Sequence, residues 1–275
     1  MNNRVLTIVV TYTPSRELLK KNISAIIDDV DWILIWENTP EGEKLQYRYI
    51  CDSKVEYCGD GINSISHALN YAWKYAEING YDYLLTMDQD SVWDDFKTYR
   101  KKVMSYIDKS DRVLGPNAYY SSINKLVECD HIITSGMLLK IDTINKIGGW
   151  NETFSIDCVD DEFCLRAKRK GIKSFYIGDC ILHQTYGNPC QVKFFWKTIV
   201  LRNDSPERLY SIYRSHVILV RMFPEFKTVK KELVNFWIPL IKWTLLFEKQ
   251  RLKKFLAINK GIIQGLFFRI SVREK

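Results

Sequence analysis

The sequence predicts an α/β fold, a mostly parallel sheet flanked by helices. Val5–Val10 is a continuous apolar, β-branched run, which is typical of a strand buried on both faces of such a sheet. Strand and helix patterns then alternate over the first ~90 residues, as they do in βαβ units. Sheets of this kind bind ligands at the carboxyl ends of their strands, so polar residues that directly follow a strand are candidates for a site.

The elements after the first strand are predicted from apolar spacing and from turn residues. The segment Thr11–Ser15 breaks the first strand, and Gly80 ends the second helix. Four further elements are predicted: a helix at Glu17–Val30, a strand at Trp32–Trp36, a helix at Ser64–Asn79 and a strand at Tyr83–Met87.

Composition indicates a globular protein. The chain has 275 residues, of which 46% are apolar and 27% charged, so one large domain or two small ones can bury a sizeable core. Its 7 cysteines form no CxxC pair, which argues against a disulfide framework and against a zinc site. The apolar run near the amino terminus is too short for a signal peptide, so we expect a cytoplasmic location.

Charge is distributed unevenly along the chain. Residues 1–190 hold 22 Lys and Arg against 27 Asp and Glu, whereas residues 191–275 hold 18 against 6. A basic tail predicts an anionic partner, and an anionic membrane surface or a nucleic acid are the two obvious ones. We expect a globular domain over residues 1–225 and a basic amphipathic helical tail over residues 226–275.

The tail favours a membrane surface over a nucleic acid. Leu233–Phe247 is apolar but is broken by Pro239 and Lys242, so it falls short of the ~20 residues that span a bilayer. Phe255–Val272 alternates apolar and basic residues at helical spacing, which is typical of a helix in a membrane interface. The tail region also holds three tryptophans, Trp196, Trp237 and Trp243. The alternative is an amphipathic helix packed on the body with its basic residues in water.

The sharpest chemical feature is Asp88-Gln89-Asp90, directly after the strand Tyr83–Met87. Side chains two residues apart on an extended segment point the same way, so Asp88 and Asp90 can face one cavity while Gln89 faces elsewhere. Paired carboxylates are hard oxygen ligands for Mg²⁺ or Mn²⁺, which usually bind together with substrate phosphates.

A second acidic cluster lies at residues 157–162, with four carboxylates in six residues. Such density is too great for a packed core, because mutual repulsion would raise the pKa values. If Asp160 begins a helix, Arg166 lies four residues after Glu162 and can hold it in place. The alternative is an exposed acidic helix start that the helix dipole favours.

His183 follows the apolar run Tyr176–Leu182 and could ligate a metal or a diphosphate, whereas the other three histidines are interpreted as structural. The sequence contains no dinucleotide-binding glycine pattern after its first strand, no phosphate-loop motif and no nucleophile elbow. Nicotinamide enzymes, P-loop enzymes and α/β-hydrolases are therefore disfavoured.

Taken in order, these elements resemble glycosyltransferase family 2, the inverting nucleotide-sugar enzymes with the GT-A fold. Asp88–Ser91, Ile156–Glu162 and Ser205–Tyr210 resemble its rhamnosyltransferase-like branch in particular. The matching segments, which lie within residues 4–225, are Val10–Tyr12, Glu37-Asn38, Ala68–Asn70, Asp88–Ser91, Ser135–Met137, Gly148–Trp150, Asp160–Arg166 and His183.

The resemblance implies a role for each matching position. Asp160 would be the catalytic base, and Asp88, Asp90 and His183 would hold Mg²⁺ or Mn²⁺. The nucleotide-sugar would be bound by Thr11, Tyr12, Glu37, Asn63, Asp88, Arg208 and Arg214. The sugar and acceptor pocket would be formed by Gly136, Trp150, Asp157 and Glu162. Three positions depart from the family: Ser64 stands where glycine is usual, Val159 stands where an acidic residue often precedes the base, and Ser215 follows Arg214 where asparagine is common.

The function implied by the resemblance is transfer of a sugar to a hydroxyl of a glycan or lipid-linked acceptor in cell-surface polysaccharide synthesis. dTDP-rhamnose is the first choice of donor and a UDP-sugar the second, and the basic tail would place the enzyme on the inner face of the plasma membrane. A metal-dependent sugar-phosphate nucleotidyltransferase and a non-catalytic binding module of the same fold are the alternatives. A nucleic-acid partner is not expected.

Overall fold

The computed structural model describes residues 3–107, 110–118, 126–184, 190–194 and 196–270. Contacts between Cα atoms divide the chain into two compact units, Met1–Thr185 and Tyr186–Lys275. This division comes earlier than the 225/226 boundary expected from composition. The reason is that helix α6 (Pro206–Met222) packs along α9 (Arg251–Phe267) and so belongs with the tail.

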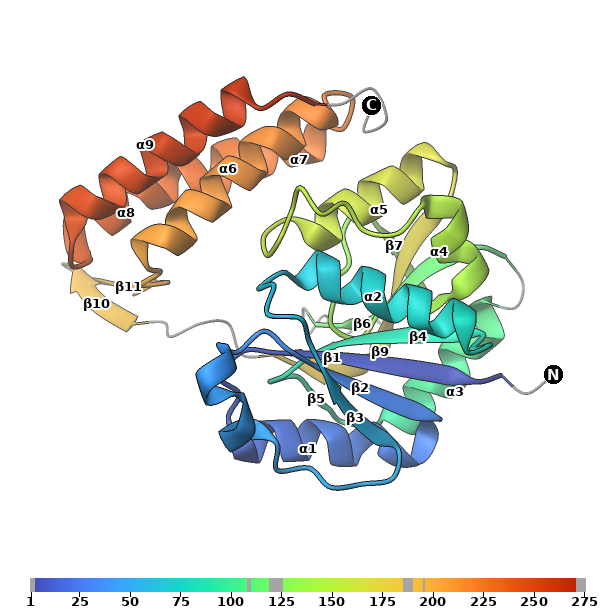
Figure 1. The fold of residues 1–275 in the computed structure, drawn as a ribbon. Coiled ribbons are helices and arrows are strands. Elements are labelled where there is room, and N and C mark those ends of the chain that lie inside the picture. The colour runs from blue at the N-terminus through green and yellow to red at the C-terminus, as the bar shows by residue number, and fades with distance from the viewer. Residues whose placement is uncertain (1–2, 108–109, 119–125, 185–189, 195, 271–275) are drawn as a thin grey trace. The chain divides into compact units, whose positions relative to one another are not determined.

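The N-terminal unit alternates strands and helices, as the sequence predicts (Figure 1). Its strands are β1 (Val5–Thr11), β2 (Trp32–Glu37), β3 (Val55–Cys58), β4 (Tyr83–Asp88), β5 (Val92–Trp93), β6 (Arg112–Asn117), β7 (Leu126–Cys129), β8 (Leu138–Lys140) and β9 (Lys173–His183). Its helices are α1 (Arg16–Ile26), η1 (Ile27–Asp29), η2 (Glu41–Tyr47), α2 (Ile65–Ile78), α3 (Phe96–Ile107), α4 (Ile141–Ile147) and α5 (Val159–Arg169).

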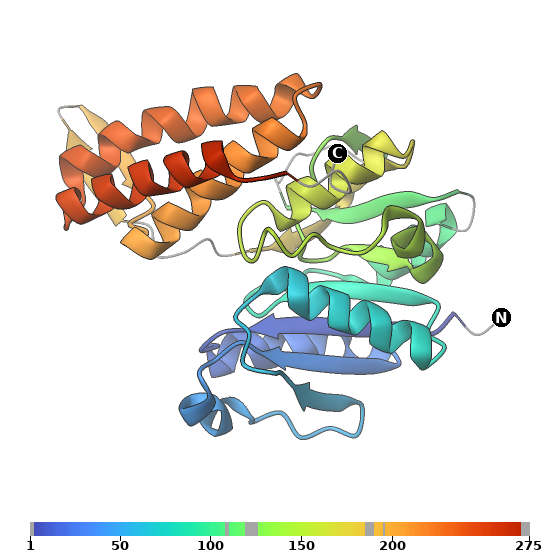
Figure 2. The same cartoon turned by 45° about the horizontal axis from the view of Figure 1, so that its top comes forward.

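The main sheet has the order β3-β2-β1-β4-β8. β1 pairs in parallel with β2 and β4, β2 pairs in parallel with β3, and β8 alone runs antiparallel to its neighbour. Helices α1 and α3 cover one face and α2 covers the other (Figures 1 and 2). The predicted α/β class with a mostly parallel sheet is confirmed. Every residue of β1 is buried, which explains its unbroken apolar run.

The N-terminal unit contains a second, smaller sheet, which holds the segment after Asp90. β9 is its central strand, paired in parallel with β6 and antiparallel with β5 and β7. The register places Val92 opposite His183, so the segment after Asp90 is held against the end of β9. The Asp88–Asp90 segment is thereby held between two sheets.

Helix α2 begins at a serine where the resembling family usually has glycine. The Ser64 hydroxyl accepts a hydrogen bond from the backbone N–H of His67 at 3.3 Å, which caps the helix. Ser64 Oγ also lies 3.1 Å from Ser66 Oγ. The serine therefore has a structural reason of its own, and α2 ends before Gly80 as predicted.

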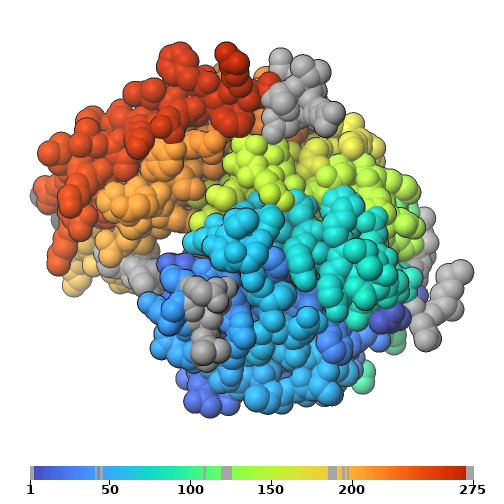
Figure 3. All heavy atoms as spheres, in the orientation of Figure 1, coloured from blue at the N-terminus to red at the C-terminus, as the bar shows by residue number. Residues whose placement is uncertain are grey.

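The C-terminal unit consists of a hairpin and a group of helices. The hairpin strands are β10 (Cys190–Phe194) and β11 (Lys197–Leu201), which pair antiparallel. The helices after α6 are α7 (Lys227–Glu232), η3 (Leu233–Trp237), α8 (Ile238–Phe247) and α9. The space-filling view shows the red surface of α9 lying along the orange surface of α6 (Figure 3). Among the described residues, no helix has the length and apolar character needed to cross a bilayer.

Glycines bring α9 close to α6. A Cβ added at Gly261 would lie 2.5 Å from Tyr210 O, and one at Gly265 would lie 2.8 Å from Val217 Cβ. Glycine inside a helix costs about 1 kcal/mol relative to alanine. The close approach explains why glycine occupies both positions despite that cost.

One of the three tail tryptophans belongs to the core of this unit rather than to its surface. Trp237 is buried, its backbone carbonyl accepts a hydrogen bond from Tyr213 Oη at 2.6 Å, and its ring packs on His216. Trp196 is 88% exposed. Interface contact by Trp237 is therefore ruled out by its burial, whereas Trp196 stays accessible.

We predict that Gly261→Ala lowers the free energy of unfolding by about 1–3 kcal/mol, because the added methyl overpacks the α6–α9 contact. Lys253→Ala, at an exposed position of the same helix, should leave the free energy of unfolding nearly unchanged. Urea unfolding followed by circular dichroism measures both variants. A Gly261→Ala protein as stable as the parent would contradict the close packing.

Candidate active site

The candidate site begins at the carboxyl end of β4. Asp88 is the last residue of this strand and Asp90 lies in the turn after it, and both are partly buried. The backbone N–H of Asp88 donates to Ser135 Oγ at 3.0 Å, and Ser135 Oγ donates to Ser91 Oγ at 2.7 Å. Two buried serines thus hold the backbone of the acidic turn.

Gln184 is the side-chain partner of Asp88. Gln184 Nε2 donates to Asp88 Oδ2 at 2.7 Å, from the position directly after β9. His183, its neighbour, was predicted as a metal ligand, and its Nε2 lies 2.7 Å from Asp94 Oδ1. Successive side chains of an extended segment point to opposite sides. These two hydrogen-bond contacts bring Gln184 to Asp88 and His183 to Asp94, on opposite sides of the strand end.

Gln89 turns away from the two acids, as expected, and joins the end of β1 to the acidic turn. Its Oε1 accepts a hydrogen bond from Tyr12 N at 2.6 Å, and its Nε2 donates to Tyr12 O at 3.1 Å. A side-chain amide that bonds both backbone groups of one residue acts like a short piece of strand pairing. Tyr12 itself exposes its ring.

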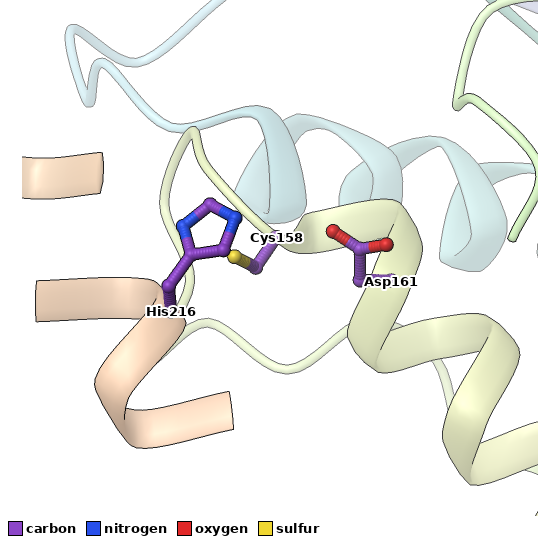
Figure 4. A group of neighbouring side chains, drawn as sticks. All are labelled: Cys158, Asp161 and His216. Atoms are coloured by element: carbon purple, nitrogen blue, oxygen red, sulfur yellow. The ribbon is translucent and has the colours of Figure 1, made fainter. Parts of the chain in front are cut away.

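The second acidic cluster lies at the start of α5. Figure 4 shows Asp161 on the first turn of this helix and Cys158 on the residue before it. Asp160 and Asp161 both face His131, which lies in the segment after β7. His131 Nδ1 lies 2.5 Å from Asp161 Oδ1, and His131 Nε2 lies 4.0 Å from Asp160 Oδ2. These three side chains form a compact group that could itself hold a cation.

Electrostatics connect the two acidic clusters. Burial, followed by the negative charges of Asp90 and Asp160, raises the pKa of Asp88 to about 7. Burial also raises the pKa of Asp90. Burial raises the pKa of Asp160 to about 6; the His131 imidazole opposes this shift, and the Asp161 charge adds to it. Asp88 and Asp160, 72 positions apart in the sequence, are close enough to repel each other.

Arg166 links Glu162 to the segment that leads to Trp150. Both carboxylate oxygens of Glu162 accept hydrogen bonds from Arg166 at 2.8 Å, which confirms the predicted pairing. Arg166 also donates to the carbonyls of Ile147 and Gly149, tying α5 to the segment before Trp150. Glu162 is thus engaged in holding the backbone that carries Trp150.

Trp150 is held at its backbone and buried at its ring. Its N–H and carbonyl both bond the side-chain amide of Asn70, at 2.8 and 2.9 Å. The ring stacks on Phe163 with centroids 4.8 Å apart. Its buried Nε1 has no hydrogen-bond partner among the described residues. An orphaned donor of this kind is available to a bound ligand. Asp157, which is also predicted to line the pocket, comes shortly after Trp150 in the sequence and is buried.

Two of the predicted nucleotide residues, Thr11 and Glu37, are the last residues of β1 and β2. Thr11 is buried and its Oγ1 donates to Trp36 O at 3.1 Å. Glu37 is buried, and Arg48 donates to both its oxygens, the shortest contact being 2.5 Å. The Glu37 carboxylate is therefore already paired. Asn63 is exposed, just before α2.

Three other predicted residues lie elsewhere or serve packing. Gly136 is buried with a φ of +86°, and an added Cβ would lie 2.7 Å from Pro116 Cγ, so the position requires glycine. Arg208 and Arg214 lie on α6 of the C-terminal unit. Their contact with a diphosphate stays a prediction.

Sequence reasoning missed Gln184, interpreted His131 as structural, and gave no role to Ser91 or Ser135, although both serines lie in matching segments. Each of these residues follows or precedes a strand end, but so do many polar residues, and no spacing rule joins residue 131 to 160 or residue 184 to 88. The signal available for Gln184 was its position two residues after the apolar run Tyr176–Leu182.

Comparisons with known proteins bear on the family resemblance and on the fold. The chain is 25% identical to the dTDP-rhamnosyl transferase RfbF of Shigella flexneri, over 97% of each protein. No protein-family model matches the sequence. The similarity to RfbF confirms the resemblance to rhamnosyltransferase-like proteins.

Solved structures share the fold. A mannosyltransferase from Pyrobaculum calidifontis, in complex with GDP-Man and Mn²⁺, aligns with a TM-score of 0.60 at 12% identity, over 96% of this chain and 87% of that one. S. aureus TarS residues 1–349 align with a TM-score of 0.58 at 14% identity, over 96% and 81%. GalNAc-T7 with UDP, GalNAc and Mn²⁺ aligns at 0.62 and 10%, over 96% of this chain but 56% of that one. The GT-A fold expected from the motifs is confirmed.

We predict that Asp160→Asn makes the protein more stable at neutral pH. The folded state raises the pKa of Asp160 from about 3.9 to about 6, so its ionised form destabilises the fold above that range, and this cost vanishes below pH ~4. The Tm gain should grow between pH 4 and 6 and stay constant above. Thermal melts across this range measure it; a gain that is equal at pH 4 and pH 7.5 would contradict the assignment.

Proposed function

We propose that this protein is an inverting glycosyltransferase that moves a sugar, with L-rhamnose as the first choice, from a nucleotide-diphospho-sugar to a hydroxyl of a glycan or lipid-linked acceptor. The observation that carries the proposal is that the chain brings Asp88, Asp90 and Asp160 together in one partly buried group, where the charges of Asp90 and Asp160 add to burial in raising the pKa of Asp88. A fold without a ligand for these carboxylates gains nothing from placing them together. Catalytic sites commonly hold such groups at perturbed pKa values.

The donor assignment rests on the relative. RfbF is described as a dTDP-rhamnosyl transferase and matches along nearly its whole length. TarS has also been solved with UDP-GlcNAc and the Pyrobaculum enzyme with GDP-Man, so this fold serves different nucleotide-sugars. dTDP-rhamnose is therefore the first donor to test and a UDP-sugar the second. On this proposal the exposed ring of Tyr12 stacks on the base, and Thr11, Asn63 and the Arg48-paired Glu37 shape the nucleoside pocket.

Asp88 and Asp90 would hold Mg²⁺ or Mn²⁺. The donor set fits, because carboxylate oxygens are the ligands these ions prefer. The pKa of Asp88 is raised first by burial and then by the charges of Asp90 and Asp160, and a divalent cation would offset the contribution of those charges. When bound, such an ion neutralises charge on the leaving diphosphate. His183 would join it as a third ligand only by leaving Asp94, whose Oδ1 lies 2.7 Å from its Nε2, and by turning to the side of the strand end where Asp88 lies. Arg208 or Arg214 would place a positive charge beside the diphosphate.

Asp160 would act as the general base. Its raised pKa of about 6 lies close to neutral pH, which suits a group that accepts a proton during attack and is ionised beforehand. The acceptor hydroxyl would give its proton to Asp160 as its oxygen attacks the anomeric carbon opposite the leaving group. A single displacement of this kind inverts the anomeric configuration, and Trp150, Asp157 and Gly136 would bound the sugar and acceptor pocket.

The acceptor and location follow from the tail. The C-terminal unit carries the excess of Lys and Arg, and anionic lipids attract such segments by about 1 kcal/mol per basic residue near the surface. We propose that the protein acts at the inner face of the plasma membrane on a growing cell-surface polysaccharide.

Asp160→Asn is expected to lower kcat by at least about a hundredfold while the donor Kd changes less than about threefold, because only proton transfer is lost. Transfer is followed by product analysis and donor binding by calorimetry. The same variant is predicted to be more thermostable, so a loss of activity cannot be assigned to unfolding. Turnover at the parent rate would show that another residue is the base.

A panel of nucleotide-sugars should identify the donor by thermal shift. A ligand at a hundred times its Kd stabilises the fold by about 2.7 kcal/mol, and we expect dTDP-rhamnose to do so only with Mn²⁺ or Mg²⁺ present. Asp90→Asn should abolish the thermal shift that dTDP-rhamnose gives with metal. Asp142→Asn, at an exposed position of α4, should keep that shift. Equal shifts with and without metal would contradict the assignment of Asp88 and Asp90.

A further inference from the structure

Helix α9 turns two glycines toward its own unit and its large apolar side chains outward. Because an α-helix turns about 100° per residue, positions 254, 258, 261 and 265 fall on one side of α9. This side is buried against the rest of the C-terminal unit, and it includes the two glycines that touch α6. The packing side of the helix therefore carries two glycines and only one large apolar residue, Ile258.

The opposite side of α9 carries the large apolar residues. Leu252 is 71% exposed and Phe267 is 82% exposed, at the two ends of the helix. The same rotation puts Leu256 and Ile263 between them, with Phe255 and Leu266 at the margins, and all four are exposed. An ordinary amphipathic helix turns such residues to the core.

The unit as a whole shows the same excess. Among the described residues, twelve of the sixteen exposed large hydrophobic side chains lie in the C-terminal unit. They include Phe236, Ile238 and Leu246 on η3 and α8 and Trp196 between the strands of the hairpin. Monomeric soluble proteins scatter such side chains singly, so their concentration here indicates a binding surface.

Basic residues border the apolar side of α9. Lys253 and Lys260 are exposed and lie on its flank, about 80–100° from Leu252 by the helical rotation. Long lysine side chains can lay their methylenes along an apolar layer while the ammonium stays in water. The exposed residues of α9 include no Asp or Glu. An anionic and apolar surface complements both features.

We propose that the outward face of α9, formed by Leu252, Phe255, Leu256, Ile263, Leu266 and Phe267, inserts into the interface of an anionic lipid bilayer. This deepens the proposed membrane association by naming the surface that makes it. The helix lies in the membrane plane, its glycine side remains on α6, and Lys253 and Lys260 meet the lipid phosphates. A second copy of the chain is the competing occupant, but like basic borders on two copies would repel each other.

The test is sedimentation of the whole protein with phosphatidylcholine vesicles that contain phosphatidylglycerol. Leu252→Gln combined with Leu256→Gln and Phe267→Gln should lower the partition coefficient at least about tenfold, because three apolar side chains no longer leave water. Ile78→Gln removes an equally exposed apolar residue, 83% exposed on α2, and should bind as the parent does. Circular dichroism checks that the variants are folded.

Lys253→Gln with Lys260→Gln completes the set and should weaken binding mainly at low salt. If the triple variant sediments like the parent while the lysine variant does not, the tail binds lipid by charge alone and the assigned face is wrong, although membrane association stands. If the parent ignores vesicles and light scattering shows a dimer that the triple variant loses, the face joins two copies and the proposal fails. Loss of vesicle binding in the triple variant alone supports it.

Discussion

The burial of neighbouring carboxylates is the constraint on which the candidate site depends. Asp88, Asp90 and Asp160 come from two elements, the end of β4 and the start of α5, and each has a pKa raised by burial. Such a group is unfavourable by itself, so the surroundings must hold it. The serine pair fixes the backbone of Asp88, Gln184 bonds its side chain, and His131 sets a positive partner beside Asp160 and Asp161 when it is protonated.

The same constraint explains why the neighbouring structure is so heavily cross-linked by hydrogen bonds. Arg166 bonds Glu162 and two carbonyls, and Asn70 bonds both backbone groups of Trp150. These contacts join α5, α2 and the segment between α4 and α5 into one support. A group of like charges keeps its geometry only if its frame resists the tendency to spread.

Much of this frame could be predicted from the sequence, since β1, α1, β2, α2 and β4 each have a clear apolar period and clear turn residues. The acidic turn and the Glu162–Arg166 pair also depend on local spacing, and both were found. Gln184 and His131 could not be, because their partners lie 96 and about 30 positions away and only tertiary packing brings them together. The contact-based division at 185/186 differs from the expected 225/226 boundary for a related reason, because composition does not report the close approach of α6 and α9 at Gly261 and Gly265.

Gln89 has a consequence for anyone who would redesign this protein. Its amide bonds the backbone of Tyr12 on one side, and its own backbone joins Asp88 to Asp90 on the other. On the proposed function, the segment that would meet the base and the turn that would carry the metal ligands therefore share one side-chain link. Substitutions at the end of β1 that displace the Tyr12 backbone would then also shift the acidic turn for as long as Gln89 joins the two.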